Sequence, residues 1–122
     1  MGGGLCGSLL SILLARRGIK VTLLERRADP RKDSIDVGRS INLVLSARGI
    51  RALKYAGVFE QIEPLLIPMQ GRLIHDENGK TELHPYGKDD SEVIYSVSRA
   101  GLNRKLIDCS DHAQNVTIRF QH

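Results

Sequence analysis

The segment Gly2-Gly3-Gly4-Leu5-Cys6-Gly7 decides the fold of this chain, because its glycines follow the GxGxxG spacing and an apolar periodic run begins within it. In such a loop the first glycine permits a tight turn, the second lets the backbone approach a pyrophosphate, and the third lets the helix pack close to a strand. Unpaired amides at a helix start attract an anion. Gly2, Gly4 and Gly7 are therefore predicted to hold a phosphate. A flexible glycine-rich terminus is the alternative interpretation.

The residues that follow complete the pattern around this loop. Leucine and isoleucine recur at steps of three and four over residues 5–14, which predicts a helix that ends near Gly18. The short apolar run over residues 19–25 predicts a buried strand. Glu25 ends this run 23 positions after Gly2, close to the spacing of the acid that accepts hydrogen bonds from an adenosine ribose. A surface glutamate is the alternative.

The rest of the chain alternates between helical and extended patterns, which indicates an α/β fold. Asn78-Gly79 is a strong hairpin signal. We therefore predict a partial Rossmann-like, dinucleotide-binding α/β fold with an inserted antiparallel hairpin. Because only Met1 precedes the first glycine, the strand that should come before the loop is expected to be missing. The predicted elements are a loop over residues 26–38, a helix over 46–56, a helical turn over 61–66, strands over 71–75, 81–84 and 93–97, a helix over 99–109 and a strand over 116–120.

Length and charge limit the classes of function. The chain has 122 residues, of which 41% are apolar and 26% charged, so it is one domain or a piece of one. Residues 1–60 carry 11 Lys and Arg against 5 Asp and Glu, and 12 of the 18 cations are arginines, which suit phosphate and carboxylate ligands. Basic tracts interleaved with aromatics are missing, so no nucleic-acid partner is predicted. The longest apolar stretch has seven residues, so no membrane span is predicted in this chain.

Cysteine and histidine usage predicts a cytoplasmic protein without a metal site. Cys6 and Cys109 form no CxxC pair and are expected to be buried, reduced thiols. The four histidines show no ligand spacing, so no metal is predicted. No Ser/His/Asp or Cys/His arrangement stands out, so no catalytic acid, base or nucleophile is predicted.

Three further segments carry a resemblance to a known family. They are residues 38–49 (GRSINLVLSARG), Pro85-Tyr86-Gly87 and residues 95–104 (YSVSRAGLNR). With the glycine loop they make nearly all of the chain resemble the kynurenine 3-monooxygenase family of FAD-dependent aromatic hydroxylases. The resemblance implies FAD as cofactor, NADPH and O2 as co-substrates, and hydroxylation of L-kynurenine to 3-hydroxykynurenine. It also implies that residues 1–122 are the amino-terminal part of an FAD-binding domain, incomplete at both ends and inactive alone.

The resemblance implies cofactor roles for particular residues. Cys6 would lie with the glycine loop along the FAD pyrophosphate. Arg27 would lie over the adenine or near phosphate, although a solvated arginine is the alternative. Val44 matches a position on the flavin side that is usually alanine in relatives. The implied FAD-binding residues outside the loop are Leu24, Glu25, Arg26, Arg27, Val44 and Arg99.

The same resemblance implies that Arg72 and Tyr86 hold the amino-acid carboxylate of the substrate. The chemistry is suitable, because arginine offers a two-pronged donor and a tyrosine hydroxyl adds a third hydrogen bond. Read without the resemblance, Arg72 is a solvated strand cation and Tyr86 a loop aromatic.

Two other classes of function stay open from the residues alone. One is a small nucleotide-binding or regulatory module without catalytic activity, which would use the basic first half to hold an anion. The other is nucleic-acid binding by the basic surface. For a full-length eukaryotic relative, the resemblance implies the mitochondrial outer membrane as the location in place of the cytoplasm.

Overall fold

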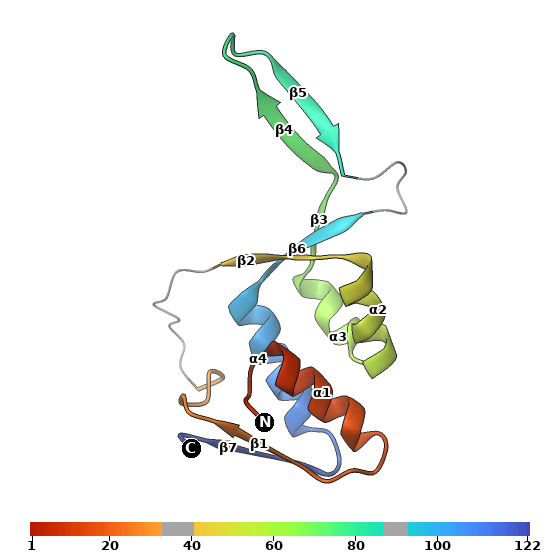
Figure 1. Ribbon diagram of the computed structural model, residues 1–122, viewed down its shortest axis with the longest axis vertical. Helices are drawn as coiled ribbons and strands as arrows, with labels where there is room; N and C mark the ends of the chain where they lie inside the picture. Colours follow the sequence, from red (N-terminus) through yellow and green to blue (C-terminus); the bar gives the residue numbers. More distant parts are fainter. Residues whose placement is uncertain (33–40, 87–92) are drawn as a thin grey trace.

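The computed structural model describes residues 1–32, 41–86 and 93–122. Two parallel strands, β1 (Val21–Glu25) and β7 (Val116–Phe120), pair in register from Val21 and Val116 to Glu25 and Phe120. Helices α1 (Leu5–Ala15) and α4 (Arg99–Asp111) precede these strands and pack together beside them (Figure 1). The chain is therefore an α/β fold, as predicted.

Within the described residues, one face of the parallel pair is covered and the other is exposed. Leu23 of β1 is fully buried, whereas Leu24, whose side chain points to the opposite face, is 46% exposed. The alternation follows from the period of two in a strand.

Small side chains let helices α1 and α4 approach each other closely. The Ser11 hydroxyl donates to the Ser8 carbonyl at 2.7 Å and lies 2.6 Å from the Ser110 hydroxyl. Ser11 has one proton to donate, so Ser110 is the donor in the bond between helices.

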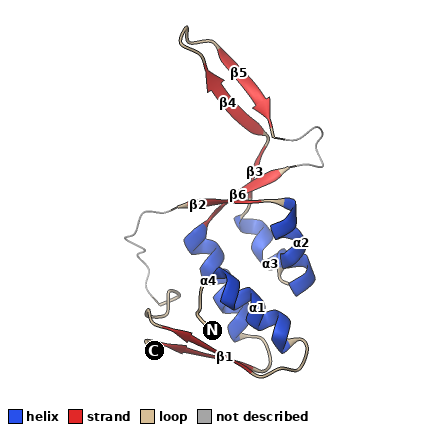
Figure 2. Cartoon of the chain, viewed as in Figure 1, coloured by secondary structure: helices blue, strands red, loops and turns tan. Residues whose placement is uncertain are grey.

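A three-stranded antiparallel sheet lies on the other side of the helices (Figure 2). Strand β6 (Ile94–Ser98) is its centre, between β2 (Asn42–Leu45) and β3 (Ile67–Met69). Between β2 and β3 the chain forms α2 (Ala47–Ala56), α3 (Phe59–Ile62) and the 3-10 turn η1 (Glu63–Leu65). The core joins these helices to α1, α4 and β6 through Ile12, Leu53, Ala56, Val58, Ile62, Val97, Leu102, Leu106 and Cys109.

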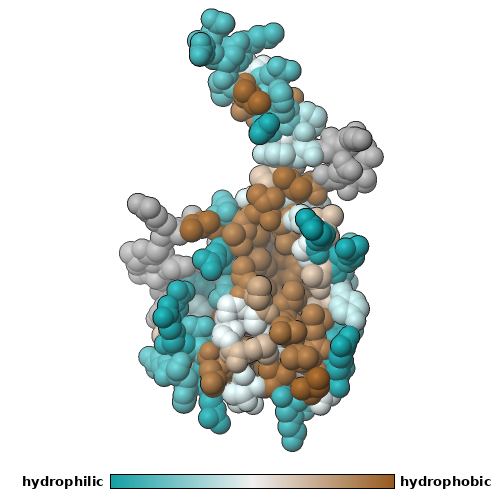
Figure 3. All heavy atoms as spheres, viewed as in Figure 1, coloured by the Kyte–Doolittle hydropathy of each residue, from teal (hydrophilic) through white to brown (hydrophobic). Residues whose placement is uncertain are grey.

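Strands β4 (Gly71–His75) and β5 (Thr81–Pro85) form a hairpin that projects from the body (Figure 1). The tip of this hairpin is hydrophilic, in contrast to the apolar surface over the body (Figure 3). At the turn, Gly79 N–H donates to Asp76 O at 3.0 Å, and Gly79 adopts a left-handed φ of 77°. The hairpin prediction is confirmed. Among the turn residues only Gly79 needs the left-handed conformation.

Several element predictions are confirmed with small shifts at their ends. The first helix ends at Ala15, the first strand begins at Val21, and the final helix extends to Asp111. The predicted helix over 46–56 forms over Ala47–Ala56 and is capped by Gly57, whose φ is 73° and whose N–H donates to Lys54 O. The part of the predicted loop over 26–38 that covers residues 33–38 lies outside the described residues, as do Gly38 and Gly87 of the family motifs.

Two strands of the antiparallel sheet were not predicted. Strand β2 has only four residues, none fully buried, so its apolar pattern is weak. Strand β3 has three residues and contains Pro68, which cannot donate to a neighbouring strand and is tolerated because β3 lies at the sheet edge. No helix in the described ranges is long and apolar enough to cross a membrane.

Candidate nucleotide-binding site

The amino-terminal end of α1 presents unpaired backbone donors. Gly4 precedes the helix in an extended conformation, and the first backbone bond runs from Ser8 N–H to Gly4 O at 2.9 Å. Within the described residues, no acceptor pairs with the amides of Leu5, Cys6 and Gly7, and no side chain caps the helix. The first turn also carries no acid. These donors and the positive end of the helix dipole favour an anion.

The glycine loop contacts the acid that ends β1. Gly3 N–H donates to Glu25 Oε2 at 3.1 Å, and Arg27 N–H donates to Glu25 Oε1 at 3.0 Å. Glu25 is half-buried, and each of its oxygens keeps a further lone pair. The carboxylate is therefore oriented by two amides while it retains acceptors for hydroxyl groups of a ligand.

The glycines of the loop serve different purposes. A Cβ on Gly7 would overlap the Gly2 carbonyl oxygen, so Gly7 is required by the loop itself. The three atoms nearest to such a Cβ all belong to Gly2, in the turn before the helix, and the role of Gly7 in packing the helix against the strand stays a prediction. A Cβ on Gly2 or Gly4 would meet no atom within 4 Å, which leaves open space beside the free amides.

Gly3 was not singled out by the GxGxxG pattern, yet it lies closest to the acid. A Cβ at Gly3 would approach Glu25 Cβ to 3.1 Å, and Gly3 is buried. The signal was available in the sequence, where Gly3 is the middle one of three consecutive glycines. The role of Gly3 could not be predicted from it, because the sequence does not show that the end of β1 lies beside the glycine loop.

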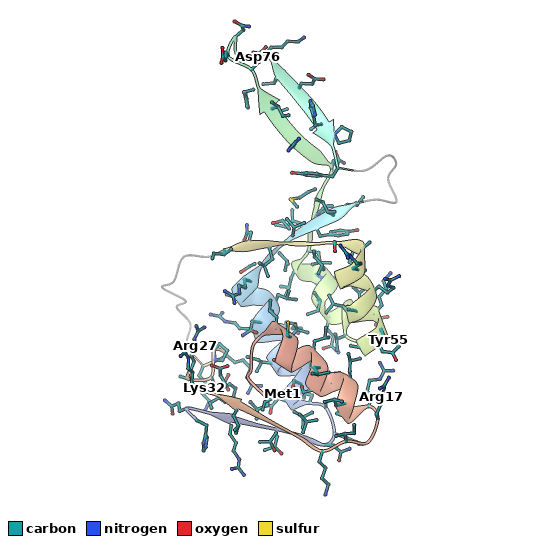
Figure 4. All side chains as sticks on the ribbon, viewed as in Figure 1. Met1, Arg17, Arg27, Lys32, Tyr55 and Asp76 are labelled. Carbon is teal, nitrogen blue, oxygen red and sulfur yellow. The ribbon has the colours of Figure 1, made fainter. Side chains whose placement is uncertain are left out.

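The other residues assigned to the adenosine side lie at the exposed end of β1. Leu24 N–H donates to Met1 O at 2.7 Å, and the side chains of Leu24 and Arg26 are exposed. Arg27 is also exposed and extends from the loop after β1 (Figure 4). Cys6 is exposed in the first turn of α1, so the prediction that it is buried is wrong, whereas Cys109 is buried as predicted. Burial raises the pKa of the Cys109 thiol.

Arg99 and Val44 lie away from the glycine loop in sequence. Arg99 is the exposed first residue of α4, and its N–H donates to Ile41 O at 3.0 Å. Helices α1 and α4 each lead into the start of a parallel strand, so both helices begin toward the carboxyl ends of those strands. Val44 is 62% exposed in β2, opposite Ser96.

Arg72 and Tyr86 are brought to one face of the projecting hairpin. Arg72 pairs with His84, and Tyr86 N–H donates to Gln70 O at 3.2 Å, which continues the register by one residue. Because side chains two residues apart share a face, Arg72, His84 and Tyr86 point to the same side. Both predicted residues are exposed. They are diagonal neighbours across the two strands.

A clamp of three charged side chains fixes the loop after β1, and the sequence patterns did not indicate it. We call Asp29, Arg31 and Asp111 the charged clamp. Arg31 Nε donates to Asp29 Oδ1 at 2.9 Å, Arg31 Nη2 donates to Asp29 Oδ2 at 2.8 Å, and Arg31 Nη1 donates to Asp111 Oδ2 at 2.7 Å. The guanidinium also lies 5.8 Å from the centre of the Phe120 ring. The hydrogen bond from Arg31 holds the pKa of Asp29 below its ordinary value.

The lowered pKa of Asp29 predicts how stability depends on pH. An acid with a depressed pKa in the folded state stabilises that state above its ordinary pKa of 3.8, and this stabilisation is lost as the pH falls through the folded pKa. We expect the contribution of this pair to the free energy of unfolding to be constant from about pH 7 to about pH 5 and to fall in stronger acid. Urea unfolding at several pH values measures it. Asp29→Asn should show a shallower decline below pH 4, and equal slopes would contradict the assignment.

Among the described residues, no group of three or more His, Cys, Asp or Glu side chains could hold a metal ion. The polar groups gathered around the glycine loop are instead backbone amides, one carboxylate and arginines. Such a set suits a ligand that carries both phosphate and sugar hydroxyl groups.

Comparison with known proteins points to flavin enzymes. A sequence family described as FAD binding domain matches residues 1–122. Kynurenine 3-monooxygenase of Myxococcus xanthus is 50% identical over 121 residues, which are 99% of this chain and 26% of that protein. The enzyme of the same name from Stenotrophomonas maltophilia is 47% identical over 120 residues, 98% of this chain and 26% of that protein. The chain thus spans about a quarter of the length of these curated relatives.

Solved structures share the fold. The p-nitrophenol 4-monooxygenase of Pseudomonas putida superposes with a TM-score of 0.76 at 18% identity, over 98% of this chain and 30% of that chain. A probable FAD-dependent monooxygenase of Pseudomonas aeruginosa superposes with a TM-score of 0.68 at 21% identity, over 98% of this chain and 31% of that chain. At these identities the likeness concerns the fold alone.

Proposed function

The chain belongs to the FAD-binding domain family, and from this premise we propose that it holds the adenosine diphosphate half of FAD as part of a kynurenine 3-monooxygenase. The observation that carries the proposal is the hydrogen bond of 3.1 Å from Gly3 N–H to Glu25. It joins the uncapped start of α1 to the acid at the end of β1. One ligand with a diphosphate next to a ribose can then contact both.

The residues present fit this group. The free amides of Leu5, Cys6 and Gly7 would hold the diphosphate, and the open space at Gly2 and Gly4 lets it approach the backbone. Glu25 would accept hydrogen bonds from the ribose. The exposed guanidinium of Arg27 is free to stack on the adenine, with Leu24 and Arg26 beside it. Arg99 and Val44 would lie toward the flavin end.

We also propose that β1 and β7 belong to a larger Rossmann-like parallel sheet, with a strand that precedes the glycine loop in a longer parent protein. Two observations support this. Leu24 N–H donates to Met1 O, so Met1 already lies along the free edge of β1. Parallel sheets are normally covered on both faces, whereas Leu24 and Thr117 are exposed here.

The proposed reaction is the hydroxylation of L-kynurenine to 3-hydroxykynurenine with NADPH and O2. When bound, FAD supplies the oxygen chemistry of this reaction. The described side chains bind and orient: Arg72 and Tyr86 would grip the carboxylate of the substrate from one face of the hairpin. We expect this chain alone not to hydroxylate kynurenine. The share of the relatives that it spans, about a quarter, supports this expectation.

Titration of the chain with ADP tests the proposal. We expect a dissociation constant on the order of 1 mM or tighter, equivalent to about −4 kcal/mol. In an NMR titration the largest shifts should fall on the amides of Leu5, Cys6 and Gly7. Adenosine without phosphates is the matched control and should leave these amides unshifted. If ADP at several times that concentration shifts none of them, the proposed site is wrong.

Arg72→Ala should impair substrate binding in a full-length parent enzyme. Loss of a charge-assisted pair removes roughly 1.5–3 kcal/mol, so the KM for L-kynurenine should rise by about tenfold or more. The flavin content of the purified enzyme should be unchanged. Lys80→Ala, which removes a cation near the hairpin turn, is the control and should leave KM as it was. A loss of flavin with an unchanged KM would show that Arg72 does not bind substrate.

A further inference from the structure

The loop after β1 is attached to the body on two sides. On one side, Gln121 N–H donates to Arg27 O at 3.2 Å and His122 N–H donates to Glu25 O at 3.1 Å, both from the residues that follow β7. On the other side, the charged clamp joins the loop to the last residue of α4. Within residues 26–32, the clamp is the only side-chain link to another element for which the structure shows a hydrogen bond.

Arg31 is suited to this link because all of its side-chain hydrogen bonds come from one planar group. Two of its nitrogens bind both oxygens of Asp29, which is 8% exposed, and the third reaches Asp111. Asp29 Oδ1 also accepts the backbone N–H of Arg31 at 3.0 Å, so the turn and the side-chain pair support each other. A lysine could not make these bonds at the same time, because its charge is a single point.

The charged clamp affects the orientation of the Glu25 carboxylate through the backbone of the loop between Glu25 and Arg31. Arg27 N–H is one of the two donors that orient the Glu25 carboxylate, and it belongs to the segment that Arg31 anchors. If the segment moves, this donor moves away from Glu25 Oε1. The other donor, Gly3 N–H, then has to orient the carboxylate alone.

We propose that Arg31 is a positioning residue: through the loop it sets the orientation of the Glu25 carboxylate toward the nucleotide sugar. That the ligand of Glu25 is a sugar rests on the proposed function. That Arg31 orients the Glu25 carboxylate does not rest on it, so an experiment can refute one claim and leave the other standing.

Hydrogen exchange of the whole chain, measured by NMR, tests the orientation directly. In Arg31→Met, the amides of Arg27 and Gly3 should exchange about tenfold faster than in the unaltered chain, because their common acceptor is no longer fixed. The buried amide of Leu23 should keep its rate. Lys32→Met is the matched control, since it removes a neighbouring exposed cation whose side chain donates no hydrogen bond to the described residues, and it should leave all three rates unchanged.

A second measurement tests whether Arg31→Met changes the preference of the chain for a nucleotide with ribose hydroxyl groups. The ratio of the dissociation constants of 2′,3′-dideoxy-ADP and ADP should be about tenfold in the unaltered chain and close to one in Arg31→Met. General loss of stability would weaken both ligands equally and leave the ratio unchanged. Should Arg31→Met fail to fold, Asp111→Ala removes the hydrogen bond from Arg31 to α4, leaves the longer ion pair of Arg31 with Asp108 at 3.8 Å in place, and should show the same changes to a smaller extent.

The outcomes separate the two claims. Unchanged exchange at Arg27 and Gly3 in a folded Arg31→Met chain overturns the positioning role, as does an unchanged ratio of the two nucleotides. Faster exchange at both amides in a chain that binds no ADP upholds the role of Arg31 toward Glu25 and refutes the proposed nucleotide site.

Discussion

Gly7→Ala is expected to abolish ADP binding and to destabilise the chain. The added methyl group would overlap the Gly2 carbonyl oxygen and would lie 3.1 Å from the Gly2 carbonyl carbon. Both obstacles are backbone atoms, so the loop has to move as a whole. Overpacking of this kind costs about 1–3 kcal/mol. The displaced loop would also carry Gly3 away from Glu25. Urea unfolding and ADP titration measure the two effects.

Gly101→Ala is the matched control for this substitution. A Cβ on Gly101 would lie 3.6 Å from Ser98 Cβ, which is ordinary contact, and Gly101 is inside α4. Alanine favours a helix over glycine by roughly 0.5–1 kcal/mol, so this variant should be stabilised. ADP binding should be unaffected. If Gly7→Ala instead binds ADP normally and unfolds like the unaltered chain, the loop is not built as described.

Glu25→Gln is expected to weaken ADP binding by about tenfold to a hundredfold. The carboxylate accepts from Gly3 N–H and Arg27 N–H with different oxygens, and glutamine offers only one acceptor oxygen. One amide is then left facing an NH2 group, and the charge that strengthens a hydrogen bond from ribose is gone. Such charge-assisted bonds contribute roughly 1.5–3 kcal/mol. Calorimetric titration measures the loss.

Comparing ADP with inorganic pyrophosphate distinguishes loss of a contact between Glu25 and the ribose from a general disturbance of the glycine loop. Glu25→Gln should lose affinity for ADP but little affinity for inorganic pyrophosphate, which has no sugar. Glu77→Gln removes a carboxylate at the exposed hairpin turn and serves as the control, with ADP affinity unchanged. If pyrophosphate binding falls as much as ADP binding, Glu25 supports the loop without contacting the sugar.

Elements with a strong local pattern could be predicted from the sequence. The apolar run of α1, the alternation of Val116, Ile118 and Phe120 in β7, and the hairpin around Asn78-Gly79 each form as expected. Strands β2 and β3 were missed because their pairing with β6 is decided by distant residues and by the helices beneath them. An alternating pattern over only three or four residues is too short to predict a strand.

The site could be predicted in part. Glycine spacing and the position of Glu25 assigned the loop and the acid to one ligand, and the structure joins the two by a hydrogen bond. The contact of Gly7 with its own turn and the role of Gly3 depend on backbone geometry that spacing does not contain. The charged clamp was missed because Asp111 lies 80 residues from Arg31. Whether Arg72 and Tyr86 bind a substrate stays a prediction.

The projecting hairpin has a consequence for the thermodynamics of unfolding. Leu73 and Leu83 face each other across its strands but are 57% and 58% exposed, so melting the hairpin transfers little additional apolar surface into water. The heat-capacity change of unfolding depends mainly on such transfer. Most of the heat-capacity change should therefore come from unfolding of the body, where Leu23 and Ile62 are fully buried. A two-stranded hairpin is only marginally stable by itself, so its amides would open without cooperative loss of the body.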